Sequence, residues 1–298
     1  MMDDAERPDL TVAQPAMALT GEAPVWDEGR ATLWWIDIQG QRLLGHRPGG
    51  EGDIVIAIPS MPGLVALAED GRLALGLEDG IWLLDPETRV FEPYAKVDLG
   101  PEMRLNDGKP DGQGRLWFGS MCTSTQRRPN GRLHRLDADG TVHAVLEGIT
   151  VPNAIAISPD GATLYFADSP TRRIDAFAID QETGALSDRR TLAAFDEGTT
   201  PDGASVDAEG ALWVAVMSGG RIERIHHDGA RETVLRLPVA RVTMPAFGGA
   251  DLRTVFVTSQ RRFLDAEALA FQPHAGHLLA ARTDMPGLPT RRMVLGLM

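Results

Sequence analysis

The sequence predicts an all-β fold, a six-bladed β-propeller with four antiparallel strands per blade. Three observations support this prediction. Short turns rich in Asp and Gly recur six times, and an apolar pair of residues follows each of them. The second residues of these pairs lie 40 to 48 positions apart, a spacing typical of propeller blades; they are Trp34, Ala74, Trp117, Tyr165, Trp213 and Phe256. Finally, 32 Gly and 20 Pro residues favour many turns between short strands.

The segment Thr200 to Asp228 shows the repeat most clearly. It reads as a turn (Pro201–Gly203), a short inner strand (Ala204–Val206), a hairpin-type turn (Asp207–Gly210), an apolar strand with Trp213 (Leu212–Val216) and an alternating third strand (Arg221–His226). Third strands are expected at corresponding places in the other repeats, at Arg42–His46, Ile81–Leu84, Arg132–Leu136, Ile174–Ile179 and His277–Ala281. The fourth strands are polar and weakly marked, as is usual at a solvated sheet edge.

The two ends of the chain complete the expected organisation. Residues 1–9 are polar and are expected to form a disordered N-terminus, and residues 10–298 are expected to form a single propeller domain. Leu10–Leu19 is expected to close the ring by pairing with the last blade. A helical solenoid is the competing repeat fold, but the helical i, i+3, i+4, i+7 pattern is not sustained anywhere, and the one plausible helical turn is Asp265–Leu269.

Composition limits the classes of partner. The net charge of −13 disfavours binding to nucleic acid or to anionic membranes. Cys122 is the single cysteine, so an intrachain disulfide and a Cys-rich zinc site are excluded. The sequence has no recognisable signal peptide and no apolar run of about 20 residues. We therefore expect a cytoplasmic protein, a monomer by default for a closed propeller, whose partner is a small molecule.

Polar residues recur where the inner strands are expected to begin. They are Glu22, Arg104, Asn106, Asn153 and Asp202. A closed ring would bring these positions together near its axis. Glu22, Asn153 and Asp202 would offer two anionic oxygens and one neutral oxygen, a set that suits Ca²⁺, Mg²⁺ or Mn²⁺ and tolerates Zn²⁺. The alternatives are turn chemistry for Asn153 and Asp202, an exposed charge for Glu22 and a surface ion pair for Arg104.

Five motifs together resemble the senescence marker protein, regucalcin and gluconolactonase family, in particular its bacterial sugar lactonases. The resemblance extends from about Thr20 to about Asp284 and is carried by GEAPVW (21–26), RLNDGKPDGQGRLWFGSM (104–121), NAIAISPDGATLYFADS (153–169), PDGASVDAEGALWVA (201–215) and FGG (247–249). It implies a six-bladed propeller with one divalent metal at the central axis. It also implies that Glu22, Asn153 and Asp202 bind the metal, and that Asp202 activates water as a base.

The resemblance further implies that Arg104 and Asn106 contact a sugar lactone. Animal members of the family have an acidic substrate-contacting residue at the position matched here by Thr123, so their gluconolactone specificity is not carried over. Arg127 and Arg128 lie in the same loop, where they would either meet a second carboxylate, as on an aldaric acid lactone, or remain solvated. Two other functions stay open: a phosphotriesterase using the same metal site, and a non-catalytic propeller that binds calcium or scaffolds partners.

Overall fold

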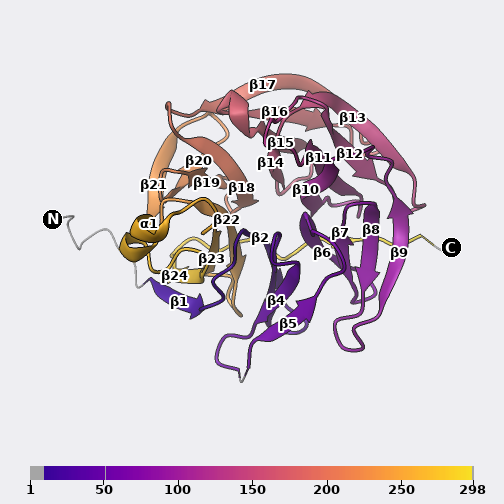
Figure 1. The fold of residues 1–298 in the computed structure, drawn as a ribbon. Coiled ribbons are helices and arrows are strands. Elements are labelled where there is room, and N and C mark those ends of the chain that lie inside the picture. Colours follow the sequence, from indigo (N-terminus) through magenta and orange to yellow (C-terminus); the bar gives the residue numbers. More distant parts are fainter. Residues whose placement is uncertain (1–9, 51, 297–298) are drawn as a thin grey trace.

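The computed structural model describes residues 10–50 and 52–296, which form six blades of four antiparallel strands arranged as a ring, one of them extended by a fifth strand (Figure 1). The expected disordered segment, residues 1–9, lies outside the described residues. The all-β, six-bladed prediction is therefore confirmed. In each blade the innermost strand borders the central axis.

Each of the first three blades contains four consecutive strands. Blade one consists of β2 (Gly21–Asp27), β3 (Thr32–Asp37), β4 (Arg42–His46) and β5 (Ile54–Ala57). Blade two consists of β6 (Leu64–Ala68), β7 (Leu73–Gly76), β8 (Gly80–Leu84) and β9 (Phe91–Lys96). Blade three consists of β10 (Met103–Pro110), β11 (Leu116–Cys122), β12 (Gly131–Leu136) and β13 (Val142–Ile149).

The last three blades follow the same order until the ring closes. Blade four consists of β14 (Pro152–Ile157), β15 (Thr163–Asp168), β16 (Arg173–Ile179) and β17 (Leu186–Ala194), with the 3₁₀ turn Ser169–Thr171 after β15. Blade five consists of β18 (Thr200–Val206), β19 (Leu212–Met217), β20 (Arg221–Ile225) and β21 (Arg231–Arg236). Blade six consists of β22 (Val242–Gly248), β23 (Thr254–Ser259), β24 (Leu278–Arg282) and, as its outer strand, β1 (Thr11–Gln14).

Both ends of the chain fasten the ring. β1 pairs antiparallel with β24, which confirms the expected pairing within a shorter span than Leu10–Leu19. Near the C-terminus, β25 (Arg292–Met293) pairs parallel with β6 in blade two. In Figure 1 this yellow segment crosses the middle of the ring toward β6. The expected helical turn is the short helix α1 (Ala266–Phe271), capped by the carboxylate of Asp265, which accepts a hydrogen bond from the Ala268 N–H.

Aspartates hold the turns of the repeats. The carboxylate of Asp207 accepts hydrogen bonds from the backbone of Ala211 at 3.0 Å and from Trp213 Nε1 at 2.8 Å. Asp111 holds the corresponding turn in blade three through Arg115 and Trp117. One carboxylate thus fixes both the tight turn and the aromatic residue of the next strand, which explains why these residues recur together in the sequence.

The hydrophobic core is divided among the contacts between neighbouring blades. Six buried clusters lie in the described residues, and each joins the facing sides of two adjacent blades. Trp34 lies in the cluster between blades one and two, Trp117 between three and four, and Trp213 between five and six. Every sheet is therefore covered on both faces. No helix in the described part of the chain is long and apolar enough to span a membrane.

Candidate active site at the axis of the ring

The predicted site residues lie within the inner strands, not before them. Pro201–Gly203, which the sequence indicates as a turn, belongs to β18, so that interpretation is wrong. The physical reason is a β-bulge, since the register of β18 against β19 shifts between Pro201 and Ala204. Such a bulge uses the same small and polar residues as a turn, and only the pairing with β19 distinguishes the two.

The same irregularity recurs around the axis. The register shifts between Glu22 and Val25 in β2, between Asn106 and Gly108 in β10, and between Asn153 and Ala156 in β14. The residue that follows each polar side chain has a left-handed backbone, with φ of 48° at Ala23, 48° at Asp107 and 50° at Ala154. Bulges break the alternation of strand side chains and redirect them, so these four inner strands can present polar groups within an apolar ring.

A chain of hydrogen bonds connects blades three, four and five. Arg104 donates from a terminal nitrogen to Asn106 Oδ1 at 2.8 Å, and Asn106 Nδ2 donates to Asn153 Oδ1 at 3.0 Å. Asn153 Nδ2 then donates to the Ser169 hydroxyl at 2.8 Å, which donates to the carbonyl oxygen of Pro201 at 2.7 Å. The structure therefore brings Arg104, Asn106 and Asn153 together beside the segment that carries Asp202. Sequence reasoning missed Ser169, because nothing local marks it as a link between blades.

Three carboxyl groups lie close enough to influence one another. Burial raises the pKa of Glu22 to about 8, and repulsion from Asp107 adds to this effect. Burial also raises the pKa of Asp202 well above its ordinary value, with further contributions from Glu22 and Asp107. Asp107 itself accepts hydrogen bonds from the backbone N–H groups of Gly108 at 2.7 Å and Ile155 at 2.9 Å. Sequence reasoning left Asp107 unassigned within the DGKPD motif, although its place beside Asn106 was a usable signal.

Cations surround these acids. Burial lowers the pKa of Arg104 to about 10, and repulsion from Arg127 contributes, whereas Glu22 and Asp202 oppose the shift. Burial likewise lowers the pKa of Lys109, against the attraction of Asp107 and Glu22. The axis therefore holds buried groups of both signs that are incompletely compensated, an arrangement typical of functional sites.

Glu22, Asn153 and Asp202 carry oxygen atoms of the kind that divalent metal ions prefer. The Glu22 carboxylate accepts a hydrogen bond from the neighbouring Ala23 N–H at 3.1 Å, and the Asp202 carboxylate accepts none from the described residues. Asn153 Oδ1 accepts one hydrogen bond, which leaves a lone pair available. No group of three or more His, Cys, Asp or Glu residues within 10–50 and 52–296 is arranged to bind a metal. A metal at the axis would thus be held by two carboxylates and one amide oxygen, completed by water.

The other predicted residues lie on the loop between β11 and β12. Thr123 is exposed, and its hydroxyl donates to the backbone oxygen of Glu102 at 3.1 Å. Arg128 is exposed and forms an ion pair with Glu102 at 3.5 Å. Arg127 instead approaches the Met121 sulfur at 3.7 Å and interacts electrostatically with Asp202. Cys122, just before this loop, is the buried last residue of β11.

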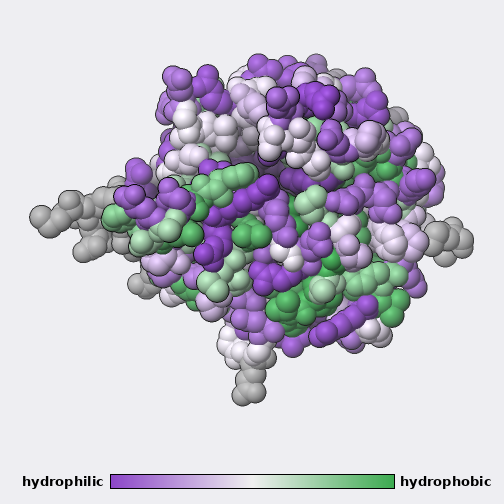
Figure 2. Space-filling view, viewed as in Figure 1, coloured by the Kyte–Doolittle hydropathy of each residue, from purple (hydrophilic) through white to green (hydrophobic). Residues whose placement is uncertain are grey.

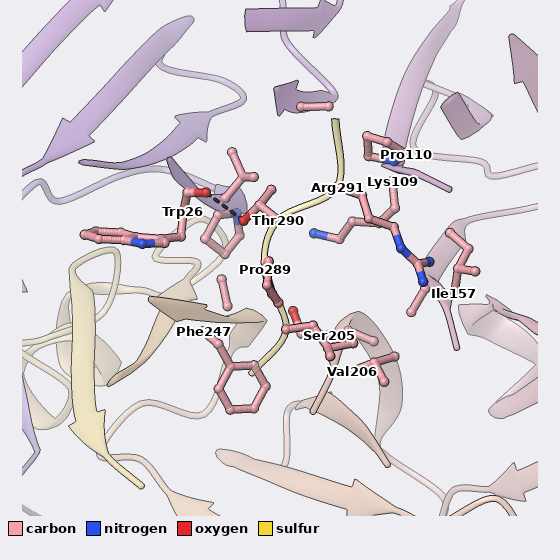
Figure 3. Close-up of a pocket in the computed structure, with 18 of the residues that line it drawn as sticks. Trp26, Lys109, Pro110, Ile157, Ser205, Val206, Phe247, Pro289, Thr290 and Arg291 are labelled. Atoms are coloured by element: carbon pink, nitrogen blue, oxygen red, sulfur yellow. Dashed lines mark hydrogen bonds between the residues drawn. The ribbon is translucent and has the colours of Figure 1, made fainter. Parts of the chain in front are cut away.

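A pocket lies toward the other ends of the inner strands, and of the charged groups at the axis described above only Lys109 lines it. Residues from the inner strands of all six blades line it, together with Leu288–Arg291. The Thr290 hydroxyl donates to the backbone oxygen of Trp26 at 2.7 Å, and Arg291 donates to that of Ser158 at 2.8 Å. Figure 3 shows this C-terminal segment crossing the channel, with the Lys109 side chain extending toward it. The C-terminal segment therefore covers this end of the axis.

The fold and the polar axis define a class of protein, a six-bladed propeller with an acidic site where its inner strands converge. The family described as "SMP-30/Gluconolactonase/LRE-like region" matches residues 20–261, and the chain belongs to this family. The chain is 36% identical to the 6-deoxy-6-sulfogluconolactonase of Pseudomonas putida, over 93% of this chain and 94% of that protein. It is 35% identical to the regucalcin of Xenopus laevis, over 86% of this chain and 88% of that protein.

A solved structure shares the architecture. The regucalcin of Agrobacterium tumefaciens, described as a calcium-binding protein, superposes with a TM-score of 0.88 at 29% identity, covering 96% of this chain and 97% of that one. The family resemblance inferred from the five sequence motifs is thereby confirmed.

Proposed function

We propose that this protein is a metal-dependent lactonase, a carboxylic-ester hydrolase that opens an aldono- or aldarolactone to the free sugar acid. The observation that carries the proposal is the pair of carboxyl groups of Glu22, half-buried, and Asp202, buried, beside the hydrogen-bonded series Arg104, Asn106 and Asn153. The names of family members support the reaction class, because one relative is a sugar-acid lactonase by name.

Glu22, Asn153 and Asp202 would hold one divalent ion, Ca²⁺, Zn²⁺, Mn²⁺ or Mg²⁺. When bound, such an ion supplies Lewis acidity that polarises the lactone carbonyl. A calcium-binding relative of the same fold supports a divalent ion as cofactor.

Asp202 acts as the general base in this proposal. Its carboxylate accepts a proton from water while the water oxygen forms a bond to the carbonyl carbon. The bond from that carbon to the ring oxygen then breaks, and the proton passes to the ring oxygen, so one water is consumed and one sugar acid is formed. A carboxylate bound to a divalent ion has a low proton affinity, so Asp202 is a weak base in this proposal, which suffices because a strained lactone ester is a modest target.

Arg104, Asn106 and Thr123 bind the substrate in this proposal. The Arg104 guanidinium supplies charge-assisted hydrogen bonds to substrate oxygens. Its orientation is fixed by hydrogen bonds to Asn106 Oδ1 and to the backbone oxygen of Leu105, both at 2.8 Å. Pre-organised donors of this kind position a substrate without a further ordering cost at the time of reaction.

The test is lactone hydrolysis followed by a pH indicator, over a panel of aldono- and aldarolactones. Each lactone is assayed before chelation, after chelation, and after addition of Ca²⁺, Mn²⁺, Mg²⁺ or Zn²⁺. The proposal expects activity that is lost on chelation and restored by one of these metals. A metal-loaded protein that hydrolyses a phosphotriester but no lactone would replace the proposal with a phosphotriesterase. Calcium binding without any hydrolysis would replace it with a non-catalytic function.

A further inference from the structure

Four arginines lie toward the end of the axis that carries the polar cluster. Arg104 lies near the start of β10, Arg127 in the loop after β11, Arg241 immediately before β22 and Arg262 shortly after β23. In an antiparallel blade, the start of the inner strand and the end of the second strand lie at the same edge. The pKa of Arg104 agrees with this placement. Burial is the main cause that lowers it, and repulsion from Arg127 and Arg262 lowers it further. Figure 2 shows hydrophilic side chains gathered over the centre of the ring.

None of these four guanidinium groups forms an ion pair with a carboxylate in the described part of the chain. Arginines elsewhere commonly do, such as Arg115 with Asp111 at 2.6 Å and Arg224 with Asp207 at 2.7 Å. This difference is notable because the protein has 42 acidic residues and a net charge of −13. The partners of two of the four are neutral, since Arg241 donates to Gln260 Oε1 at 2.8 Å and Arg127 approaches the Met121 sulfur.

Two of the arginines are held by a dedicated loop. Phe263 is exposed, has a left-handed backbone with φ of 68°, and lies 4.5 Å from the Arg262 guanidinium and 5.7 Å from that of Arg241. The Arg262 N–H donates to the backbone oxygen of Leu19 at 2.9 Å, which fastens the loop to the segment between β1 and β2. Cation–π contacts restrict both guanidinium groups and so reduce the entropy lost when a ligand binds.

Among the charged groups that influence one another at the axis, the positive groups outnumber the acids. Lys109 and the four arginines together oppose three carboxyl groups, those of Glu22, Asp107 and Asp202. A divalent ion bound by the acids would increase this excess. A neutral sugar lactone would leave the outer guanidinium groups without a counter-charge, whereas an anionic lactone would supply one.

We propose that the substrate carries a second anionic group, a carboxylate, sulfonate or phosphate ester, at the end of the sugar away from the lactone carbonyl. Arg127, Arg241 and Arg262 bind this group, and Arg128, paired with Glu102, does not. The inference rests on the lactonase function proposed above. Guanidinium groups suit all three anions because their planar donors match pairs of oxygens.

The experiment compares kcat/KM for D-gluconolactone with kcat/KM for analogues bearing a 6-carboxylate, a 6-sulfonate or a 6-phosphate. We expect the wild-type protein to prefer at least one anionic analogue about 10- to 100-fold, and the analogue that it prefers identifies the anion. Raising the ionic strength lowers this preference, since exposed charges are screened. Arg127→Gln, Arg241→Gln and Arg262→Gln each reduce kcat/KM for the anionic analogue about tenfold or more, and for gluconolactone less than about threefold.

Arg128→Gln is the matched control, because it removes an exposed guanidinium from the same loop and leaves both substrates unaffected. A protein that hydrolyses gluconolactone as efficiently as every anionic analogue overturns the inference alone. Equal losses with both substrates in the three variants overturn it as well, and thermal unfolding of each variant excludes misfolding as the cause. Absence of hydrolysis with every lactone overturns the proposed function and this inference together.

Discussion

Replacing Glu22 by glutamine is expected to stabilise the metal-free protein while removing a proposed metal ligand. Burial, and repulsion from Asp107, raise the pKa of Glu22 from 4.5 to about 8. The carboxyl group therefore ionises freely in the unfolded chain above about pH 4.5 but resists ionisation in the folded chain. The stability contributed by protonated Glu22 to the folded protein is therefore fully present below about pH 4.5. It is lost progressively as the pH rises from there through about 8.

The magnitude follows from the two pKa values. Each pH unit between them corresponds to about 1.36 kcal/mol, so the folded protein loses up to about 4 kcal/mol at pH 8 relative to the protonated state. Glu22 is half-buried and still reaches water in the channel, so we expect about half of this, roughly 2 kcal/mol. For a protein of this size that corresponds to a Tm about 4 °C higher for Glu22→Gln at pH 8, with little difference at pH 5.

The assay is thermal unfolding after exhaustive chelation, from pH 5 to pH 8.5, for wild type, Glu22→Gln and the control Glu78→Gln, which removes an exposed carboxylate. Saturating Ca²⁺ is expected to reverse the order, because a ligand that binds only the folded wild type stabilises it by mass action. Parallel pH curves for wild type and Glu22→Gln in chelator would refute the reasoning, since they would mean that folding does not oppose ionisation of Glu22.

Three further substitutions test the base, a turn and a bulge. Asp202→Asn is expected to lower lactonase kcat at least about 100-fold while metal, measured in the purified protein, is retained; a loss of only a few-fold would rule out a general base at this position. Asp207→Ala removes a fully buried carboxylate that accepts hydrogen bonds from Trp213 Nε1 and Arg224. We expect urea denaturation to show a free energy of unfolding about 3 kcal/mol lower than that of the wild type. An unchanged free energy would show that the turn is held by its backbone alone. Gly203→Ala places a Cβ 2.4 Å from Met244 Cγ. We therefore expect about 1–3 kcal/mol of destabilisation, and reduced activity because Asp202 is displaced. Unchanged Tm and kcat would show that the Met244 side chain moves away without cost.

The blades could be predicted from the sequence because their signals are local. Asp207 and Asp111 each accept hydrogen bonds from backbone N–H groups and from a tryptophan within six residues. One short segment of sequence therefore contains all the residues that determine the turn and the strand after it. Third strands such as Arg42–His46 were therefore placed with the bounds that the structure shows.

The details of the axis could be predicted only in part. Pro201–Gly203 has the composition of a turn, and only pairing with β19 makes it a bulged strand. Arg241 and Arg262 carry no local signal, since only the assembled ring brings Arg241 near Asp202 and Arg262 near Arg104. Asn106 and Asn153, 47 residues apart, meet because blades three and four are neighbours. Patterns within one blade reveal strands, whereas contacts between blades depend on the closed ring.

Closure of the ring has a consequence in time during synthesis. The Thr11 hydroxyl donates to the backbone oxygen of Ala280, 269 residues later in the chain. At an elongation rate of about 10 residues per second, roughly half a minute separates the appearance of β1 from that of its partner β24. Throughout this interval β1 has no strand to pair with, and blade one lacks blade six, against which it packs in the closed ring. Blade five lacks the same neighbour once it has been synthesised. A nascent chain can therefore assemble successive blade contacts as they emerge, but the axis, with acids from blades one, three and five, forms as a unit only after the last blade has left the ribosome.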